Sequence, residues 1–293
     1  MATTALTLQD NKPSVIALHS SLFSGRQWSR LTEALGDNYQ MIAPDISGYG
    51  NHVARPILPT TLSDEVAALG DQIDHVAGPV HLVGHSYGGA IAFKMATCER
   101  WAGRIRSLTL IEPVLPTLLR DNAADRRLHD VFADMGARVH VDLWNGAYME
   151  ALDRFLDFWS GSGPREELPG EARLRMMQAI EKVAFDFTAI LGEVNIASAA
   201  AGLRVPTLLV SGGLSPYMTQ RIVAKLAALI PGAEARHLPH AGHMLPITHA
   251  KAINPDIIRH IELTEDFAKV LLASPPGVAA SLAREPQLRL MPG

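Results

Sequence analysis

Residues 80–92 read VHLVGHSYGGAIA, and this stretch decides what kind of fold the chain can have. It begins with a short apolar run, passes abruptly into small and polar residues, and continues as a segment with few charges and helical composition. A buried strand that ends in a tight turn and leads directly into a helix has this pattern. The turn carries the motif Gly84-x-Ser86-x-Gly88. The pattern therefore predicts a strand–turn–helix unit with Ser86 at its tip.

A serine at the tip of such a unit has the position of a nucleophile. The turn forces the serine into a strained backbone conformation, and Gly84 and Gly88 leave the room that this requires. The hydroxyl then projects above the strand at the N-terminus of the next helix. There the helix dipole and the free N–H of Tyr87 stabilise negative charge on an attacked carbonyl oxygen. The alternative is a Gly/Ser tight turn without chemistry.

Apolar segments that read as buried strands recur along the chain and alternate with helix-like segments. The clear strand-like segments are 14–18, 40–43, 80–83, 107–111 and 207–210, with a weaker one at 234–238 and a short N-terminal strand at Thr4–Leu8. The helix-like segments are 25–35, 64–76, 88–99, 219–230 and 250–261. This alternation predicts an α/β fold, with a mostly parallel sheet flanked by helices on both faces.

The alternation stops between about Pro113 and Arg204, where helix formers, charges and aromatics dominate. We interpret this region as a helical cap inserted into the α/β core, with most of its aromatics in the cap's own core. The predicted organisation is a core of residues 1–113 and 204–263, a cap of residues 114–203 and a C-terminal tail of residues 264–293. Our candidates for contacts with substrate are Trp28, Trp144 and Trp159.

Composition excludes several classes of function. The chain has 293 residues, 47% of them hydrophobic, and a formal net charge of −4, with no Lys/Arg cluster that suits a nucleic acid. The single cysteine, Cys98, rules out an internal disulfide, and no cysteine-rich metal site is predicted. We expect a small-molecule substrate, no cofactor, no metal and no nucleic-acid or membrane partner, in a monomer or homodimer.

The N-terminal residues MATTALTLQDNKPS lack a basic segment followed by an apolar core, so no signal peptide is predicted. The sequence contains no apolar run of roughly 18 residues, the length that a membrane-spanning helix needs. A cytoplasmic location is the expectation.

The motifs resemble those of the α/β-hydrolase family over nearly the whole predicted core. VIALHSSLFSGRQW, residues 15–28, resembles the family's strand that ends in His-Gly and runs through a loop to a helix with a tryptophan, although Ser20 replaces the glycine. By this resemblance the N–H of Ser21 is the second oxyanion donor beside that of Tyr87, with Leu22 as the alternative. APDISGYGNH, residues 43–52, resembles the family's Asp-x-x-Gly-x-Gly loop.

The resemblance also indicates the base. HLPHAGHMLPITH, residues 237–249, follows the last predicted strand, and the family's Gly-His pattern points to His243 as general base. His240 is the alternative, and we expect His85 to point away into packing.

The acid departs from the family pattern. In LLVSGGLSPYMT, residues 208–219, Ser215 stands where the family usually has an aspartate, and a neutral serine cannot stabilise an imidazolium. Glu112 in LTLIEPVLP, residues 108–116, follows an earlier strand, at a point where some relatives carry their acid. The order Ser86, Glu112, His243 matches the family's order of nucleophile, acid and base. The alternative for Glu112 is a strand-tip acid that ties down a loop.

A serine nucleophile with two oxyanion donors suits acyl transfer through an acyl-enzyme intermediate. The leading hypothesis is a serine hydrolase that cleaves a carboxylic ester, or a similar acyl bond, of a small to medium apolar substrate. A carbon–carbon bond hydrolase and a perhydrolase or haloperoxidase-like enzyme are alternatives within the family. A non-catalytic ligand-binding protein on a hydrolase scaffold is the alternative from another class, and Ser215 is the feature that favours it.

Overall fold

A six-stranded parallel sheet forms the centre of the computed structural model, which describes residues 12–52, 59–163 and 169–275. The strand order is β2-β1-β3-β4-β5-β6. The strands are β1 (Ser14–Leu18), β2 (Gln40–Ile42), β3 (Val80–His85), β4 (Ile105–Ile111), β5 (Thr207–Gly212) and β6 (Glu234–Leu238). All six were predicted, with ends that differ by no more than a few residues. The strand predicted at Thr4–Leu8 lies outside the described residues.

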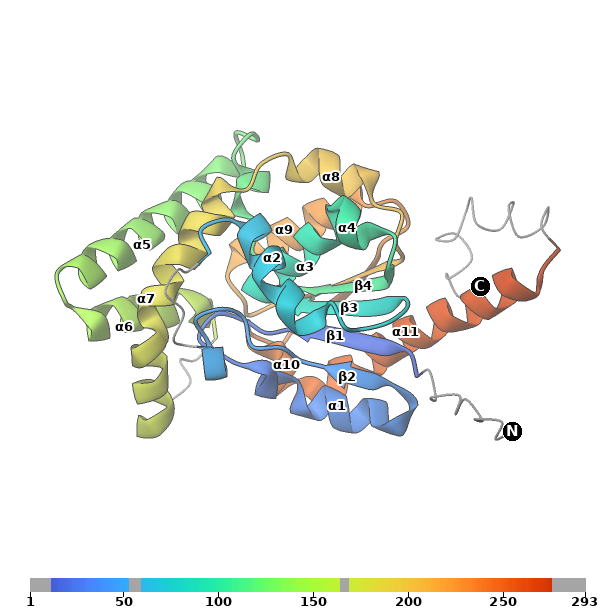
Figure 1. Ribbon diagram of the computed structural model, residues 1–293. Helices are drawn as coiled ribbons and strands as arrows, with labels where there is room; N and C mark the ends of the chain where they lie inside the picture. The colour runs from blue at the N-terminus through green and yellow to red at the C-terminus, as the bar shows by residue number, and fades with distance from the viewer. Residues whose placement is uncertain (1–11, 53–58, 164–168, 276–293) are drawn as a thin grey trace.

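Helices cover both faces of this sheet, as Figure 1 shows. Alternate side chains of β1 enter different cores: Ile16 and Leu18 pack on one face, and Val15 and Ala17 on the other. The first face is covered by α2 (Leu62–Ile73), α3 (Tyr87–Thr97), α4 (Glu99–Ala102), α8 (Ile196–Gly202) and α9 (Tyr217–Leu229). The second face is covered by α1 (Ser29–Leu35), α10 (Leu245–Thr248) and α11 (Ala250–Ala273). Short 3₁₀ turns lie at Gly25–Trp28, Gly36–Asn38, Gly50–His52 and Pro116–Leu119.

The insertion between β4 and β5 is helical, as predicted. Its longest helices, α5 (Arg126–Trp144), α6 (Tyr148–Ser160) and α7 (Gly170–Gly192), group together at one side of the sheet in Figure 1. Most of the cap's aromatics form its own core, where neighbouring ring centroids lie 5.1–6.3 Å apart. These rings belong to Phe132, Phe155, Phe158, Trp159 and Phe187.

The last helix is longer than predicted. We expected it to end near residue 261 and a tail to begin at residue 264, but α11 continues to Ala273. Thr264 is still buried, and the helix ends at Ser274, directly before Pro275. Because the residue before a proline disfavours the α conformation, Pro275 marks the end better than the loss of periodicity after residue 261 does.

Within the described residues, no single helix has the length and hydropathy to cross a membrane. In the same part of the chain, α7 and α8 pass that test of length and composition when taken together, and they are bent by 73° at the break between them.

Three buried histidines predict how stability depends on pH. Burial lowers the pKa of His19 and of His260 from 6.5 to about 4, and lowers the pKa of His85 well below 6.5. The unfolded chain binds a proton at each near pH 6.5, whereas the folded chain does not, so the folded state loses stability as the pH falls from about 6.5 toward 4. We expect the free energy of unfolding to fall by about 1.4 kcal/mol per pH unit for each histidine.

Urea denaturation at pH 7, 6 and 5 measures this effect. A hydrogen bond from Arg221 lowers the pKa of Asp125 to about 2, and a hydrogen bond from His81 lowers the pKa of Glu265 to about 2. These two carboxylates therefore lose their contribution to stability only at more acidic pH. In a His260→Gln variant the free energy of unfolding should depend less steeply on pH, because unfolding takes up one proton fewer. Equal free energies of unfolding at pH 7 and pH 5 would contradict the prediction.

Candidate active site

Ser86 lies between β3 and α3 in a backbone conformation that residues with a side chain rarely adopt. Its φ is 57° and its ψ is −118°. Its N–H donates to the carbonyl oxygen of Ile111 at 3.0 Å, so the neighbouring strand β4 holds the turn. A Cβ at Gly84 would lie 2.5 Å from the carbonyl oxygen of Gly88, and a Cβ at Gly88 would lie 2.4 Å from the carbonyl oxygens of Leu18 and His19 at the end of β1. The two glycines are thus needed for the turn, and the turn aims Ser86 away from the strand.

The three residues that the sequence suggested for a catalytic triad lie together and are buried. The Oγ of Ser86 is 2.9 Å from Nε2 of His243. The other ring nitrogen of His243, Nδ1, is 2.6 Å from Oε2 of Glu112. With Nδ1 donating to the carboxylate, Nε2 is left as the acceptor that faces the serine hydroxyl. This is the tautomer that a general base for Ser86 requires.

Glu112 reaches His243 because of where β4 ends. Carboxyl ends of neighbouring parallel strands meet at one edge of the sheet, and Glu112 follows β4 directly, in the left-handed region at φ 44°. Its Oε1 accepts the N–H of Gly212, at the end of β5, at 2.7 Å. Both carboxylate oxygens are therefore engaged. Ser215 is also buried, and its Oγ has no hydrogen-bond partner among the described residues.

A second set of contacts holds the loop of His243, and the sequence did not reveal it. Nδ1 of His85 lies 3.1 Å from Nε2 of Gln27, and Nε2 of His85 lies 2.8 Å from the carbonyl oxygen of His243. Oε1 of Gln27 accepts the N–H of Ser20 at 3.1 Å. His85 is buried as expected, but it does not point into inert packing. It links the loop after β1 to the loop that carries His243.

The candidate oxyanion donors come from two segments, the start of α3 and the loop after β1. Tyr87 begins α3, where the first N–H groups of a helix have no intrahelical acceptor. Ser21 and Leu22 lie in the loop after β1, and both line the cavity that contains Ser86. Among the described residues, the N–H groups of Tyr87, Ser21 and Leu22 have no acceptor within the chain. Leu22 has a φ of 64°, a strained value that is typical of functional loops.

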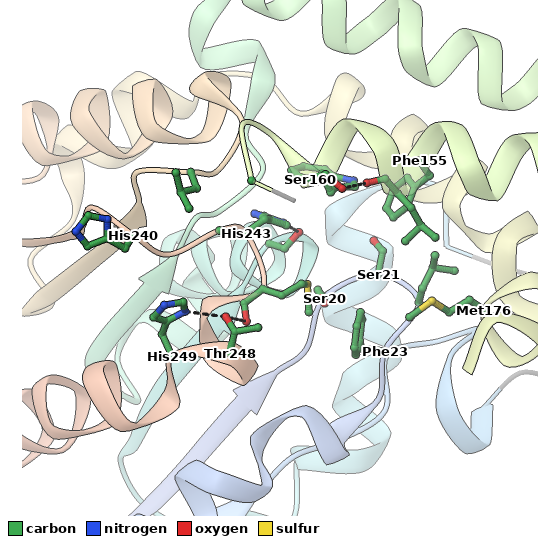
Figure 2. Close-up of a pocket in the computed structure, with 18 residues that line it drawn as sticks. Ser20, Ser21, Phe23, Phe155, Ser160, Met176, His240, His243, Thr248 and His249 are labelled. Carbon is green, nitrogen blue, oxygen red and sulfur yellow. Dashed lines mark hydrogen bonds between the residues drawn. The ribbon is translucent and has the colours of Figure 1, made fainter. Parts of the chain in front are cut away.

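A cavity of about 330 Å³ opens above Ser86 and His243. Figure 2 shows Phe155 and Met176 from the cap and Phe23 from the loop after β1 around it. Its other apolar walls are Leu22, Leu156, Trp159, Leu214 and Met244. The Trp159 ring stacks on the imidazole of His243, with centroids 4.1 Å apart and an interplanar angle of 19°. The cap therefore supplies both a wall of the cavity and a contact to the candidate base.

Two of the three tryptophans predicted to contact substrate do not line this cavity. Trp28 is buried with Leu31 and Leu245 in the core between the second face of the sheet and α1, α10 and α11. The short turn before α1 directs its ring inward. Trp144 ends α5 and is 91% exposed, on the side of the helix away from the cap core. Only Trp159 is retained as a candidate substrate contact.

His240, the alternative base, also lines the cavity but is exposed, and its ring makes no described hydrogen bond to Ser86. Within the described residues, no group of three or more His, Cys, Asp or Glu side chains is placed to hold a metal ion.

The chain is similar to known proteins over most of its length. Residues 15–256 match the alpha/beta hydrolase family. The pimeloyl-[acyl-carrier protein] methyl ester esterase of Stenotrophomonas maltophilia is 25% identical over 82% of this chain and 90% of its own length. Polyketide synthase ThaQ of Burkholderia thailandensis is 25% identical over 86% of this chain, which spans only 12% of that protein.

Among solved structures, a bromoperoxidase from Bacillus anthracis has a TM-score of 0.68 and 20% identity, over 85% of this chain and 92% of its own. That similarity concerns the fold alone. The family match covers most of the chain, including Ser86, Glu112 and His243. The chain therefore belongs to the α/β-hydrolase family.

Proposed function

We propose that this protein is a serine hydrolase that cleaves carboxylic esters of small to medium apolar substrates through an acyl-enzyme intermediate. The observation that carries the proposal is the hydrogen-bonded series from Ser86 to His243 at 2.9 Å and from His243 to Glu112 at 2.6 Å, at the base of an apolar cavity. A complete series of nucleophile, base and acid is what acyl transfer by serine requires.

In the first half of the reaction, the Oγ of Ser86 attacks the ester carbonyl while Nε2 of His243 takes its proton. Glu112 accepts the hydrogen bond from Nδ1 and stabilises the imidazolium that forms. The carbonyl oxygen becomes negatively charged and receives hydrogen bonds from the N–H groups of Tyr87 and of Ser21 or Leu22. The tetrahedral intermediate then collapses, and His243 returns the proton to the leaving alcohol.

The second half repeats these steps with water. His243 removes a proton from a water molecule, which attacks the acyl carbon, and the same oxyanion donors stabilise the second intermediate. Ser86 is released with its proton restored. The neutral pair of His85 and Gln27 holds the carbonyl of His243, so the base keeps one position through both halves.

The cavity supports an apolar substrate of limited size. Its volume of about 330 Å³ is at the lower end of small-molecule sites. Apolar side chains form most of its wall, and Ser86 and His243 supply polar atoms at the reacting centre. The feature that favours a non-catalytic binding protein was Ser215 at the usual acid position. Glu112 accepts hydrogen bonds from Nδ1 of His243 and from the N–H of Gly212, and a carboxylate at this position supports catalysis over that alternative.

Hydrolysis of p-nitrophenyl acetate, butyrate and octanoate by the purified protein tests the proposal. We expect turnover that a fluorophosphonate abolishes, with one label per chain on Ser86. A protein that neither turns over any of these esters nor takes the label would contradict the proposal.

We expect Trp159, which stacks on His243, to set the preference for the length of the ester's acyl chain. Trp159→Leu shortens a wall of the cavity, so we expect kcat/KM for octanoate to rise relative to acetate by about tenfold, the scale at which hydrophobic pockets discriminate methylene groups. Trp144→Leu is the matched control, because Trp144 is 91% exposed and lies outside the cavity.

The measurement is the ratio of kcat/KM for the two esters, taken with the melting temperature of each variant. Loss of stability in Trp159→Leu with an unchanged ratio would return Trp159 to a role in the cap core only.

A further inference from the structure

Behind Ser86, one buried lysine connects the cap to both candidate oxyanion residues. Lys182 of α7 has a side chain that is 2% exposed, and its Nζ lies 2.7 Å from Oε1 of Glu65 on α2. It also pairs with Asp186, one turn further along α7. Oε1 of Glu65 accepts the hydroxyl of Tyr87 at 2.8 Å. Oδ2 of Asp186 accepts the hydroxyl of Ser21 at 2.5 Å.

The hydrogen bonds of this cluster run in one direction. Burial raises the pKa of Tyr87 and of Tyr49 well above 10, so both phenols stay protonated and donate. The Tyr49 hydroxyl donates to the same Asp186 oxygen at 2.5 Å. Burial by itself would lower the pKa of Lys182, but the charges of Asp186 and Glu65 outweigh that effect and raise it. The ammonium is therefore charged, and its positive charge is shared between the two acids.

Stability alone does not account for such a cluster. Burying ions costs free energy that their mutual attraction often fails to recover, and apolar side chains of similar size would join two helices as well. What apolar side chains would lack is the pair of connections to Ser21 and Tyr87. Both residues carry candidate oxyanion N–H groups, which have no acceptor among the described residues.

The cluster also lies close enough to influence charge at the reacting centre. A second, small cavity of about 10 Å³ is lined by Ser86, Tyr87, Ser21 and Asp186 together, along with apolar side chains of the cap. Negative charge that forms beside Ser86 thus faces a carboxylate in a buried, weakly screened environment. Without Lys182, Asp186 and Glu65 would oppose that charge.

We propose that Lys182 is a positioning residue for the oxyanion site: through Glu65 and Asp186 it holds Tyr87 and Ser21 in place, and it offsets part of the negative charge of the two carboxylates behind Ser86. The proposal rests on the proposed function, and it makes the seating of the cap helix α7 a condition for a competent oxyanion site. The residue acts through its neighbours and touches no reacting atom.

The test measures the rate at which a fluorophosphonate labels Ser86. In this reaction Oγ displaces fluoride from phosphorus, and negative charge develops on a phosphoryl oxygen as it does on an ester carbonyl. In Lys182→Met we expect the second-order rate constant of labelling to fall by about 100-fold when it is normalised to the fraction of chains that can be labelled. A displacement of about 1 Å at a reacting centre can cause a loss of this size. For an ester that the wild type hydrolyses, Lys182→Met should lower kcat and change KM little, because the oxyanion forms only in the transition state.

Lys225→Met is the matched control. Lys225 of α9 pairs with the buried carboxylate of Asp125 at 2.8 Å, away from Ser21 and Tyr87. It should lower the melting temperature without lowering the labelling rate. The double variant Lys182→Met/Asp186→Asn tests the charge argument, because asparagine keeps an oxygen acceptor for Ser21 but removes a negative charge. We expect it to recover most of the rate lost in Lys182→Met.

Two variants that remove less test the same inference if Lys182→Met does not fold. Ser21→Ala and Tyr49→Phe each remove one hydroxyl from the same oxygen of Asp186 and leave Lys182, Glu65 and Asp186 unchanged. We expect Ser21→Ala to lower the labelling rate by about tenfold, less than the roughly 100-fold loss of an entire oxyanion donor. Tyr49→Phe should cost similar stability and much less rate.

Labelling of Lys182→Met at the wild-type rate, or equal rates in Ser21→Ala and Tyr49→Phe, would overturn the inference. A wild-type chain that takes the label but hydrolyses no ester would refute the ester substrate and leave the role of Lys182 to be decided by the labelling rates. A wild-type chain that takes no label would refute both.

Discussion

Ser86→Ala removes ester hydrolysis, with kcat expected to fall by about a million-fold, the loss that follows removal of a triad nucleophile. Alanine cannot form the acyl intermediate, and the Oγ that lies 2.9 Å from Nε2 of His243 is its only missing atom. The fold should be retained, because the turn depends on backbone contacts and on Gly84 and Gly88. Turnover of p-nitrophenyl butyrate and fluorophosphonate labelling measure the loss, with the melting temperature as a check on folding.

Ser160→Ala is the matched control for this result. Ser160 lines the same cavity from α6, but its Oγ bonds the carbonyl oxygen of Leu156 at 3.0 Å instead of contacting His243. We expect this variant to be labelled and to turn over ester. If Ser86→Ala kept the wild-type kcat/KM, another residue would be the nucleophile.

Glu112→Gln has the second largest expected effect, a fall in kcat of about 10⁴-fold. The glutamine amide oxygen stays at the position that accepts the Gly212 N–H, which in the wild type is 2.7 Å from Oε1. Its NH₂ group then faces Nδ1 of His243 and donates to it. The imidazole is thereby forced into the tautomer with a proton on Nε2, which cannot accept the proton of Ser86. The neutral amide also fails to stabilise the imidazolium.

Glu265→Gln is the control for this variant. It removes the negative charge from a different His–Glu contact, between Nε2 of His81 and Oε1 of Glu265 at 3.0 Å, which lies away from the carboxyl ends of β3 and β4. We expect an unchanged kcat. Ser215→Asp should restore part of the activity in the Glu112→Gln background, because it rebuilds an acid at the family's usual position. A Glu112→Gln enzyme with near-normal kcat would show that Glu112 only ties the end of β5.

Much of the fold was predictable because its signals are local. Strands buried on both faces appear as mostly apolar runs, and β1, β3, β4 and β5 were found that way. The two edge strands, β2 and β6, are only partly buried, and β6 gave the weaker signal. The Gly84-x-Ser86-x-Gly88 motif predicted the turn, since no other residue fits where backbone carbonyls approach so closely. Glu112 was predictable as a partner of His243 because both follow strands whose ends meet at one edge of the sheet.

The errors and omissions involve side chains whose environment is set by distant parts of the chain. Trp144 and Trp159 lie on neighbouring cap helices and look alike in sequence, yet one is exposed and the other stacks on His243. The spacing of Lys182 and Asp186 puts both on one face of a helix. The spacing does not reveal that this face of the helix is buried against Glu65.

The sequence by itself determined the order of strands and helices along the chain and the turn at Ser86, because backbone sterics and hydrophobic periodicity act between near neighbours. His243 and Glu112 were suggested by the resemblance of their segments to the α/β-hydrolase family. Only the tertiary structure decided which cap residues reach the cavity, how Gln27 and His85 hold the loop of His243, and that Lys182 joins the cap to Ser21 and Tyr87. Most of those contacts join residues more than 50 positions apart. Whether a charge or a ring is buried there depends on how the cap helices pack on the strand ends.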